Sequence, residues 1–127
     1  MRLLVDTHAY LWFDAGDNRL STAARRAIED HEGEWCVSMT SVWEMAIKAG
    51  TGRLTLPASV HDYVAERVRA GLRILAVEWP HAAAVERLPF HHRDPFDRLI
   101  VAQAQAERLA VVTRDAVFRE YGVQVVW

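Results

Sequence analysis

Residues 94–115, DPFDRLIVAQAQAERLAVVTRD, form the stretch that decides the fold. Asp94 followed by Pro95 predicts a helix start, because aspartate caps free backbone amides and proline is tolerated at the first helical position. We expect this helix to end near Arg108 and a buried strand to follow over Leu109–Thr113. A helix joined almost directly to an apolar strand is typical of an α/β unit with a parallel sheet.

The same alternation of short apolar runs and helical periodicity covers the rest of the chain. The other predicted strands are Leu3–Val5, Trp35–Ser38, Ile74–Val77 and Val123–Val126. The other predicted helices run from Ser21 to about Glu29, from Ser41 to Ala49, from Ser59 to near Gly71, and from Asp115 to Tyr121. The pattern predicts an α/β fold around a central, mainly parallel, five-stranded sheet.

Length and composition limit the class of protein. The chain has 127 residues without an internal repeat or a linker-like stretch, which predicts one domain over residues 1–127. Hydrophobic residues make up 51% and charged residues 25%, a balance typical of globular proteins. No apolar run approaches the roughly 20 residues needed to cross a bilayer, so we expect a cytoplasmic protein without a membrane partner. The single cysteine, Cys36, lacks a disulfide partner and is predicted to be a core strand residue.

Four acidic residues follow predicted strands or open predicted helices. They are Asp6, Glu44, Asp97 and Asp115. In parallel α/β sheets the carboxyl ends of the strands and the first turns of the following helices meet at one edge, where ligands bind. We therefore expect all four acids at that edge of the sheet.

Such a cluster needs a positive charge. Two carboxylates about 4 Å apart repel by roughly 4 kcal/mol at an effective dielectric constant near 20. Mg²⁺ and Mn²⁺ take oxygen ligands and keep several waters, so an acidic cluster suits them better than zinc. A cation bound there would lower the pKa of a coordinated water and assist attack on phosphorus, which predicts a phosphodiesterase.

Each acid also has a structural explanation that the sequence leaves open. Glu44 could bond back to the Ser41 amide in a capping box or pair with Lys48 one turn later. Asp97 suits the dipole at a helix start, Asp115 could cap the last helix, and Asp6 could be a loop residue. The coincidence of all four at one predicted edge favours a site.

Three motifs resemble those of the PIN-domain nucleases, and within that family the VapC-type toxins. They are LLVDTHAYLWF at residues 3–13, SMTSVWEMAIKAGTGRL at 38–54 and HHRDPFDRLIVAQAQAERLAVVTRD at 91–115. The resemblance implies a three-layer α/β/α fold and an endoribonuclease that uses Mg²⁺ or Mn²⁺ and leaves a 5′-phosphate and a 3′-hydroxyl. It also implies a cognate antitoxin as partner and a homodimer.

In residue terms, the resemblance implies that Asp6, Glu44 and Asp97 ligate the cation, with Asp115 joining directly or through water. Asp94 is either an outer acid or the helix cap, and we expect the cap. The three histidines near these motifs only weakly suggest metal ligation, so we expect carboxylate ligands alone. These histidines are His8, His91 and His92.

Neighbours of the acids are candidates for substrate contacts. Arg93, Arg98 and Arg114 adjoin the acids in sequence and are predicted to hold phosphate oxygens, with solvated surface arginines as the alternative. Thr7 is predicted either to bond a metal-bound water or to cap the first helix. For the five tryptophans, Trp12, Trp35, Trp43, Trp79 and Trp127, we expect core or interface burial rather than base stacking.

Other functional classes fit less well. A receiver-type signalling domain needs a lysine late in the chain, whereas the only lysine is Lys48. A haloacid-dehalogenase-type phosphatase needs an aspartate two residues after Asp6, where His8 stands. A PIN nuclease acting on DNA or in RNA processing, or an interaction domain without turnover, stays open. The net charge of −2 neither indicates nor excludes a nucleic-acid partner.

Overall fold

The computed structural model of the protein describes residues 2–30 and 34–127. The strands are β1 (Leu3–Val5), β2 (Trp35–Ser38), β3 (Ile74–Leu75), β4 (Ala110–Val112) and β5 (Val125–Val126). The α-helices are α1 (Thr7–Ala15), α2 (Thr22–Asp30), α3 (Met39–Gly50), α4 (Val60–Arg69), α5 (Trp79–Ala84) and α6 (Pro95–Glu107). Two short 3₁₀ helices are η1 (Val85–Arg87) and η2 (Ala116–Tyr121).

The five strands form one sheet in the order β3-β2-β1-β4-β5. Every neighbouring pair is parallel, with β1 pairing β2 on one side and β4 on the other. The chain therefore adds β2 and β3 on one side of β1 and then β4 and β5 on the other side. The carboxyl ends of all strands share one edge. The prediction of an α/β fold with a five-stranded, mainly parallel sheet is confirmed.

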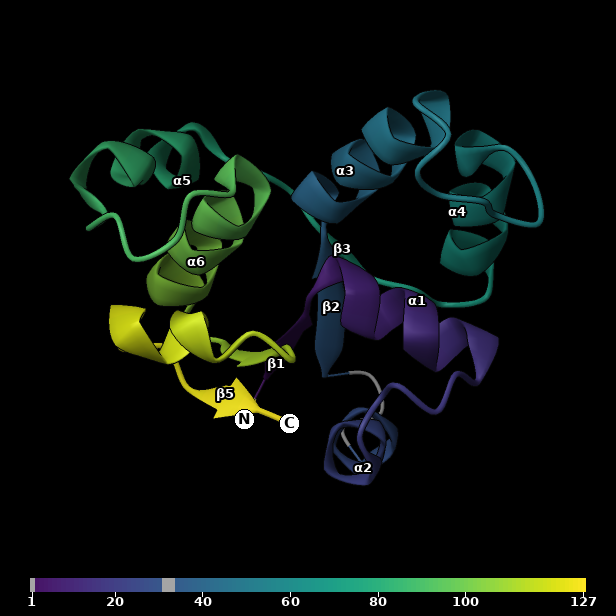
Figure 1. Ribbon diagram of the computed structural model, residues 1–127, viewed down its shortest axis with the longest axis horizontal. Coiled ribbons are helices and arrows are strands. Elements are labelled where there is room, and N and C mark those ends of the chain that lie inside the picture. The colour runs from purple at the N-terminus through teal and green to yellow at the C-terminus, as the bar shows by residue number, and fades with distance from the viewer. Residues whose placement is uncertain (1, 31–33) are drawn as a thin grey trace.

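The sheet is covered on both faces because its central strand alternates between two cores. Leu3 and Val5 point into a cluster with residues of α1, α2, α3 and α4. Leu4 points the opposite way, into a cluster built mainly from α6 and η2. All three side chains are fully buried, as expected for a strand with helices on both faces. The helices accordingly lie on either side of the sheet, which makes the three-layer arrangement (Figure 1).

Most predicted elements are present, with shorter strands at the ends of the sheet. Ser21, Ser59 and Asp94 accept backbone amides at the starts of α2, α4 and α6, as predicted. Asp115 caps a 3₁₀ helix in place of the predicted final α-helix. The helix predicted from Ser41 begins earlier, at Met39, because Ser38 caps it.

Two helices lacked a predicted range. Helix α1 starts at Thr7 with Asp6 as its cap, and it ends at Gly16, whose φ of 66° is in the left-handed region that glycine tolerates. Helix α5 spans only Trp79–Ala84, too few residues for apolar periodicity to stand out. In the described part of the chain, no helix is long and apolar enough to cross a membrane.

The tryptophans and the cysteine are less buried than predicted. Trp43 is 56% exposed and Trp79 is 81% exposed, so burial in the core of this chain is wrong for both. Trp12, Trp35 and Trp127 are partly buried against the first cluster. Cys36 is only half-buried, at the margin of the second cluster.

Candidate functional site

Three of the four predicted acids line one cavity at the carboxyl edge of the sheet. The cavity has a volume of about 390 Å³, and Asp6, Asp97 and Asp115 lie in its wall with Arg114 and Trp12. Asp6 reaches it from the exit of β1, Asp97 from the first turn of α6, and Asp115 from the loop after β4. The fold thus brings together three acids that are far apart in the sequence.

Hydrogen bonds from backbone amides hold the carboxylates of two of these acids. Asp6 Oδ1 accepts the Ala9 amide at 2.8 Å, and Asp115 Oδ1 accepts the Val117 amide at 2.9 Å, so both acids cap helices. Each keeps a second carboxylate oxygen for other contacts. The cap interpretation and the site interpretation are therefore compatible for these two residues.

Asp94 behaves as the helix cap that the sequence predicts. Its Oδ1 accepts the Phe96 amide at 2.8 Å at the start of α6. Its charge nevertheless acts on Asp97, because it is one of the groups that raise the pKa of that carboxyl. Asp94 thus shapes the electrostatics of the cavity while it holds the helix.

Glu44 is buried outside the cavity lining and is held by neighbouring side chains. Its Oε1 accepts a hydrogen bond from the Thr7 hydroxyl at 2.7 Å, and its Oε2 forms an ion pair with Lys48. The capping box with Ser41 is wrong, because α3 starts before that residue; the predicted pairing with Lys48 is present. Glu44 is close enough to raise the pKa of both Asp6 and Asp97 by its charge.

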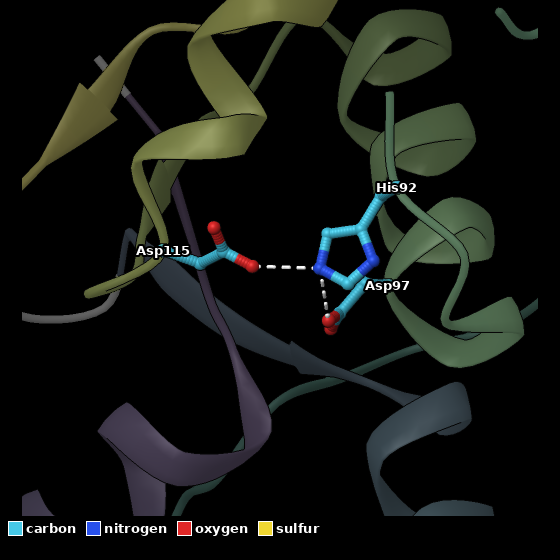
Figure 2. Close-up of side chains that lie close together, drawn as sticks. All are labelled: His92, Asp97 and Asp115. Atoms are coloured by element: carbon cyan, nitrogen blue, oxygen red, sulfur yellow. Dashed lines mark hydrogen bonds and ion pairs between the residues drawn. The ribbon is translucent and has the colours of Figure 1, made fainter. Parts of the chain in front are cut away.

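His92, from the loop before α6, sits between two of the acids. Its Nε2 lies 2.6 Å from Asp115 Oδ2 and 3.1 Å from Asp97 Oδ2 (Figure 2). One ligand atom from each of these three residues lies within 4.8 Å of the others, so the trio could together contact one ion. The sequence signal for this residue, the HHRD run, is weak.

The electrostatics of the cavity leave negative charge poorly compensated. Burial raises the pKa of Asp97 to about 7, with Asp94 adding to the shift and His92 opposing it. Burial also raises the pKa of Asp6, against hydrogen bonds from Thr113 and Ala9 that lower it. A divalent cation would relieve this arrangement, and carboxylate oxygens are donors that Mg²⁺ and Mn²⁺ favour.

Of the four residues predicted to contact substrate, two are exposed and two are buried. Arg114 is exposed in the cavity wall, and Arg93 is exposed in the loop before α6. Arg98 is only 5% exposed and donates to the carbonyl oxygens of Pro89, Val85 and Leu88, so the phosphate contact predicted for it is wrong. Thr7 is buried with its hydroxyl bonded to Glu44, which assigns it to holding that acid rather than to capping α1 or touching substrate.

The fold is an all-parallel α/β/α arrangement, and its acids gather where the strands end. A comparison with protein families identifies the class of protein to which this arrangement belongs. The PIN domain model matches residues 3–124. The chain belongs to the PIN-domain family.

Relatives within and around this family are recognisable in sequence and structure. The chain is 33% identical over 120 residues to Ribonuclease VapC22 of Mycobacterium tuberculosis, covering 94% of this chain and 91% of the relative. Its fold resembles a chain of DNA-bound VapBC from Salmonella typhimurium with a TM-score of 0.71 at 18% identity, covering 98% and 96% of the two chains. A toxin–antitoxin complex from Klebsiella pneumoniae contains a similar fold, with a TM-score of 0.61 at 18% identity over 89% and 86%.

Proposed function

We propose that this chain is a metal-dependent endoribonuclease that hydrolyses RNA phosphodiester bonds as the toxin of a toxin–antitoxin pair. The observation that carries the proposal is the group of acids at the carboxyl edge of a PIN-domain sheet, where burial raises the pKa of Asp6 and Asp97. The 33% identity to a ribonuclease over nearly the whole chain supports RNA as the substrate.

The cation would be Mg²⁺ or Mn²⁺, held by Asp6, Glu44, Asp97 and Asp115. When bound, it supplies a water of lowered pKa and neutralises charge on the phosphate. The oxygen-rich donor set and the shifted carboxyl pKa values fit such an ion. The four acids are proposed as the catalytic residues on this basis.

The side chains around the acids have separate tasks in this proposal. Lys48 and Thr7 hold the Glu44 carboxylate from two sides, which fixes its orientation without filling the cavity. Arg114 is exposed in the cavity wall and has no acidic partner among the described residues, so its guanidinium is free to bind a phosphate oxygen. Arg93, exposed in the neighbouring loop, is proposed to hold a phosphate further along the strand.

A protein partner follows from the toxin role. We propose a cytoplasmic homodimer neutralised by a cognate antitoxin. The toxin–antitoxin complex that shares this fold supports the antitoxin partner. Trp12 is partly buried and lines the acidic cavity, so a partner segment packed against it would also obstruct RNA.

The test is cleavage of a labelled, structured RNA by protein freed of any copurified partner, with Mg²⁺, with Mn²⁺ and with EDTA. Asp6→Asn is the matched variant, because asparagine caps a helix as well as aspartate and keeps α1 intact. We expect metal-dependent cleavage that Asp6→Asn abolishes. Cleavage that survives in EDTA or in the variant would contradict the proposal.

A further inference from the structure

His92 has contacts that make it more than a neighbour of the acids. Its ring lies between Asp97 on α6 and Asp115 after β4, and Nε2 faces both carboxylates (Figure 2). The two carboxylates carry like charge and come from separate elements, so they would repel without a group between them. The ring is the only side chain of the described residues that links both acids directly.

The hydrogen bond at Nδ1 determines which nitrogen of the His92 ring carries the proton. The Asp94 amide donates to His92 Nδ1 at 3.1 Å. A backbone N–H can only donate, so Nδ1 must be an unprotonated acceptor, and the ring proton must lie on Nε2. Nε2 therefore donates its hydrogen bond to Asp115 Oδ2, with Asp97 Oδ2 3.1 Å away, and has no lone pair free for a cation.

The ring is also held in place from outside the site. The His92 amide donates to the Tyr121 hydroxyl at 2.8 Å, and the ring meets the Phe118 ring edge to face, with centroids 6.2 Å apart. Asp94, whose amide fixes the ring, also caps α6 through its own side chain. The helix that presents Asp97 and the histidine that contacts it are thus fixed by the same loop residue.

We propose that His92 is a positioning residue of the acidic site, whose Nε2–H orients the carboxylates of Asp97 and Asp115 for a divalent cation, and that it is not itself a ligand. The inference rests on the proposed function, since it concerns the same cation. The proximity of the three side chains alone would suggest a His-Asp-Asp ligand set. That arrangement would require the ring proton to move to Nδ1 and the hydrogen bond from the Asp94 amide to break.

The tautomer is tested first, in the unaltered protein. Nitrogen NMR of ¹⁵N-histidine-labelled protein, free and with saturating Mg²⁺, distinguishes protonated from unprotonated ring nitrogens. We expect a protonated Nε2 and an unprotonated Nδ1 for His92 in both states. A protonated Nδ1 with Mg²⁺ bound would overturn the proposal.

Cation binding is tested next, with Mn²⁺ alone as the probe. His92→Leu removes the donor, His92→Gln keeps an amide donor near the place of Nε2, and His91→Leu is the matched control at the exposed neighbouring histidine. By calorimetry we expect His92→Leu to weaken Mn²⁺ binding by roughly 10- to 100-fold, the usual range for partners of metal ligands, with His92→Gln restoring most of it. Unchanged binding by folded His92→Leu would overturn the proposal.

Pulsed electron paramagnetic resonance of bound Mn²⁺ separates the two roles of the ring. We expect no signal from a directly coordinated ¹⁴N nucleus in the wild-type protein. A ¹⁴N coupling that His92→Leu removes would make His92 a ligand and overturn this inference while leaving the metal site intact. Failure of folded wild-type protein to bind Mn²⁺ would instead overturn the proposed metal site, and this role with it.

Discussion

Two acidic regions lie at opposite ends of helix α1 and differ in how their charge is compensated. At the end of α1, Asp14 accepts two hydrogen bonds from Arg67, at 2.8 and 3.0 Å, and one from the Tyr63 hydroxyl at 2.6 Å. At its start, Asp6 shares a cavity with Asp97 and no arginine or lysine bonds to either acid among the described residues.

The pKa values express this difference. Burial alone would raise the pKa of Asp14, but the hydrogen bonds from Arg67 and Tyr63 outweigh burial and lower it. Burial raises the pKa of Asp6 and Asp97, and the neighbouring carboxylates add to the shift for both. The ion pair of Asp14 with Arg67 joins α1 to α4, and the two side chains neutralise each other's charge. The cavity acids need a proton or a cation to neutralise their charge.

We expect the largest effect, a loss of RNA cleavage, from Asp97→Asn. We expect RNA cleavage to fall by about 10²- to 10³-fold, the range seen when a charge-stabilising group is removed from an active site. Thermal stability of the metal-free protein should stay the same or rise, because the substitution removes a carboxylate from a repulsive cluster. Cleavage rates and melting curves of the two proteins check this. A large loss of stability would mean that the cavity acids hold the fold, which would break the comparison.

The sequence predicted the scaffold because its signals are local. Leu3–Val5 and Trp35–Ser38 are short, mainly apolar runs that form the central strand and one of its neighbours, and their bounds agree with the structure. Capping residues such as Ser59 and Asp94 likewise act within three residues of the helix they start. The parallel sheet then places the acids at one edge, because the carboxyl ends of parallel strands meet there.

The parts that sequence could not predict depend on contacts distant in the chain. Arg98 adjoins Asp97, yet helical geometry directs it toward the carbonyl oxygens of the η1 region, where it is buried. His92 meets Asp115 across 23 residues, a contact that no local pattern records. Trp43 resembles a core residue by type, but it is 56% exposed against Phe96. Sequence adjacency placed these residues near the acids but did not predict their contacts.

The second prediction concerns pH and distinguishes the regions by sign. The folded pKa of Asp97, about 7, lies above its ordinary value of 3.8, so the folded state binds this proton more tightly than the unfolded state. The metal-free protein should therefore lose stability as pH rises from about 4 to about 7, on the order of 4 kcal/mol in total. Asp14 acts in the opposite direction, because its pKa is lowered: its contribution is present above 3.8 and is lost as pH falls below that value.

Chemical denaturation at several pH values measures this slope. Saturating Mg²⁺ and the Asp97→Asn substitution should each flatten the decline, Mg²⁺ because it replaces the proton and the variant because the titrating group is gone. A decline that persists unchanged in Asp97→Asn would assign the effect to groups outside the cavity.

The third prediction removes the compensated acid. Asp14→Ala breaks the bidentate pair with Arg67 and leaves the Tyr63 hydroxyl without its acceptor. We expect a loss of about 1–2 kcal/mol in the free energy of unfolding, kept modest because solvent reaches the pair. RNA cleavage and Mn²⁺ affinity at a temperature where both proteins are folded should not change. Denaturant titration and calorimetry give the two readouts, and a fall in Mn²⁺ affinity would show that the two regions are coupled.

The smallest effect is expected at a third acid, Asp17, which tests whether a lowered pKa by itself marks a stabilising pair. The hydrogen bonds from Arg19 lower the pKa of Asp17, just as Arg67 lowers that of Asp14. Arg19 is, however, 62% exposed, so water and salt screen the pair, and its side chain loses conformational freedom when it binds. Arg19→Gln should therefore return the pKa of Asp17, followed by NMR titration, toward its ordinary value without a measurable change in the unfolding midpoint. If Arg19→Gln lowered stability as far as Asp14→Ala does, a lowered carboxyl pKa would by itself indicate a stabilising pair, whether or not the pair joins two helices. The difference between the Asp14 region and the cavity acids would then be one of charge alone.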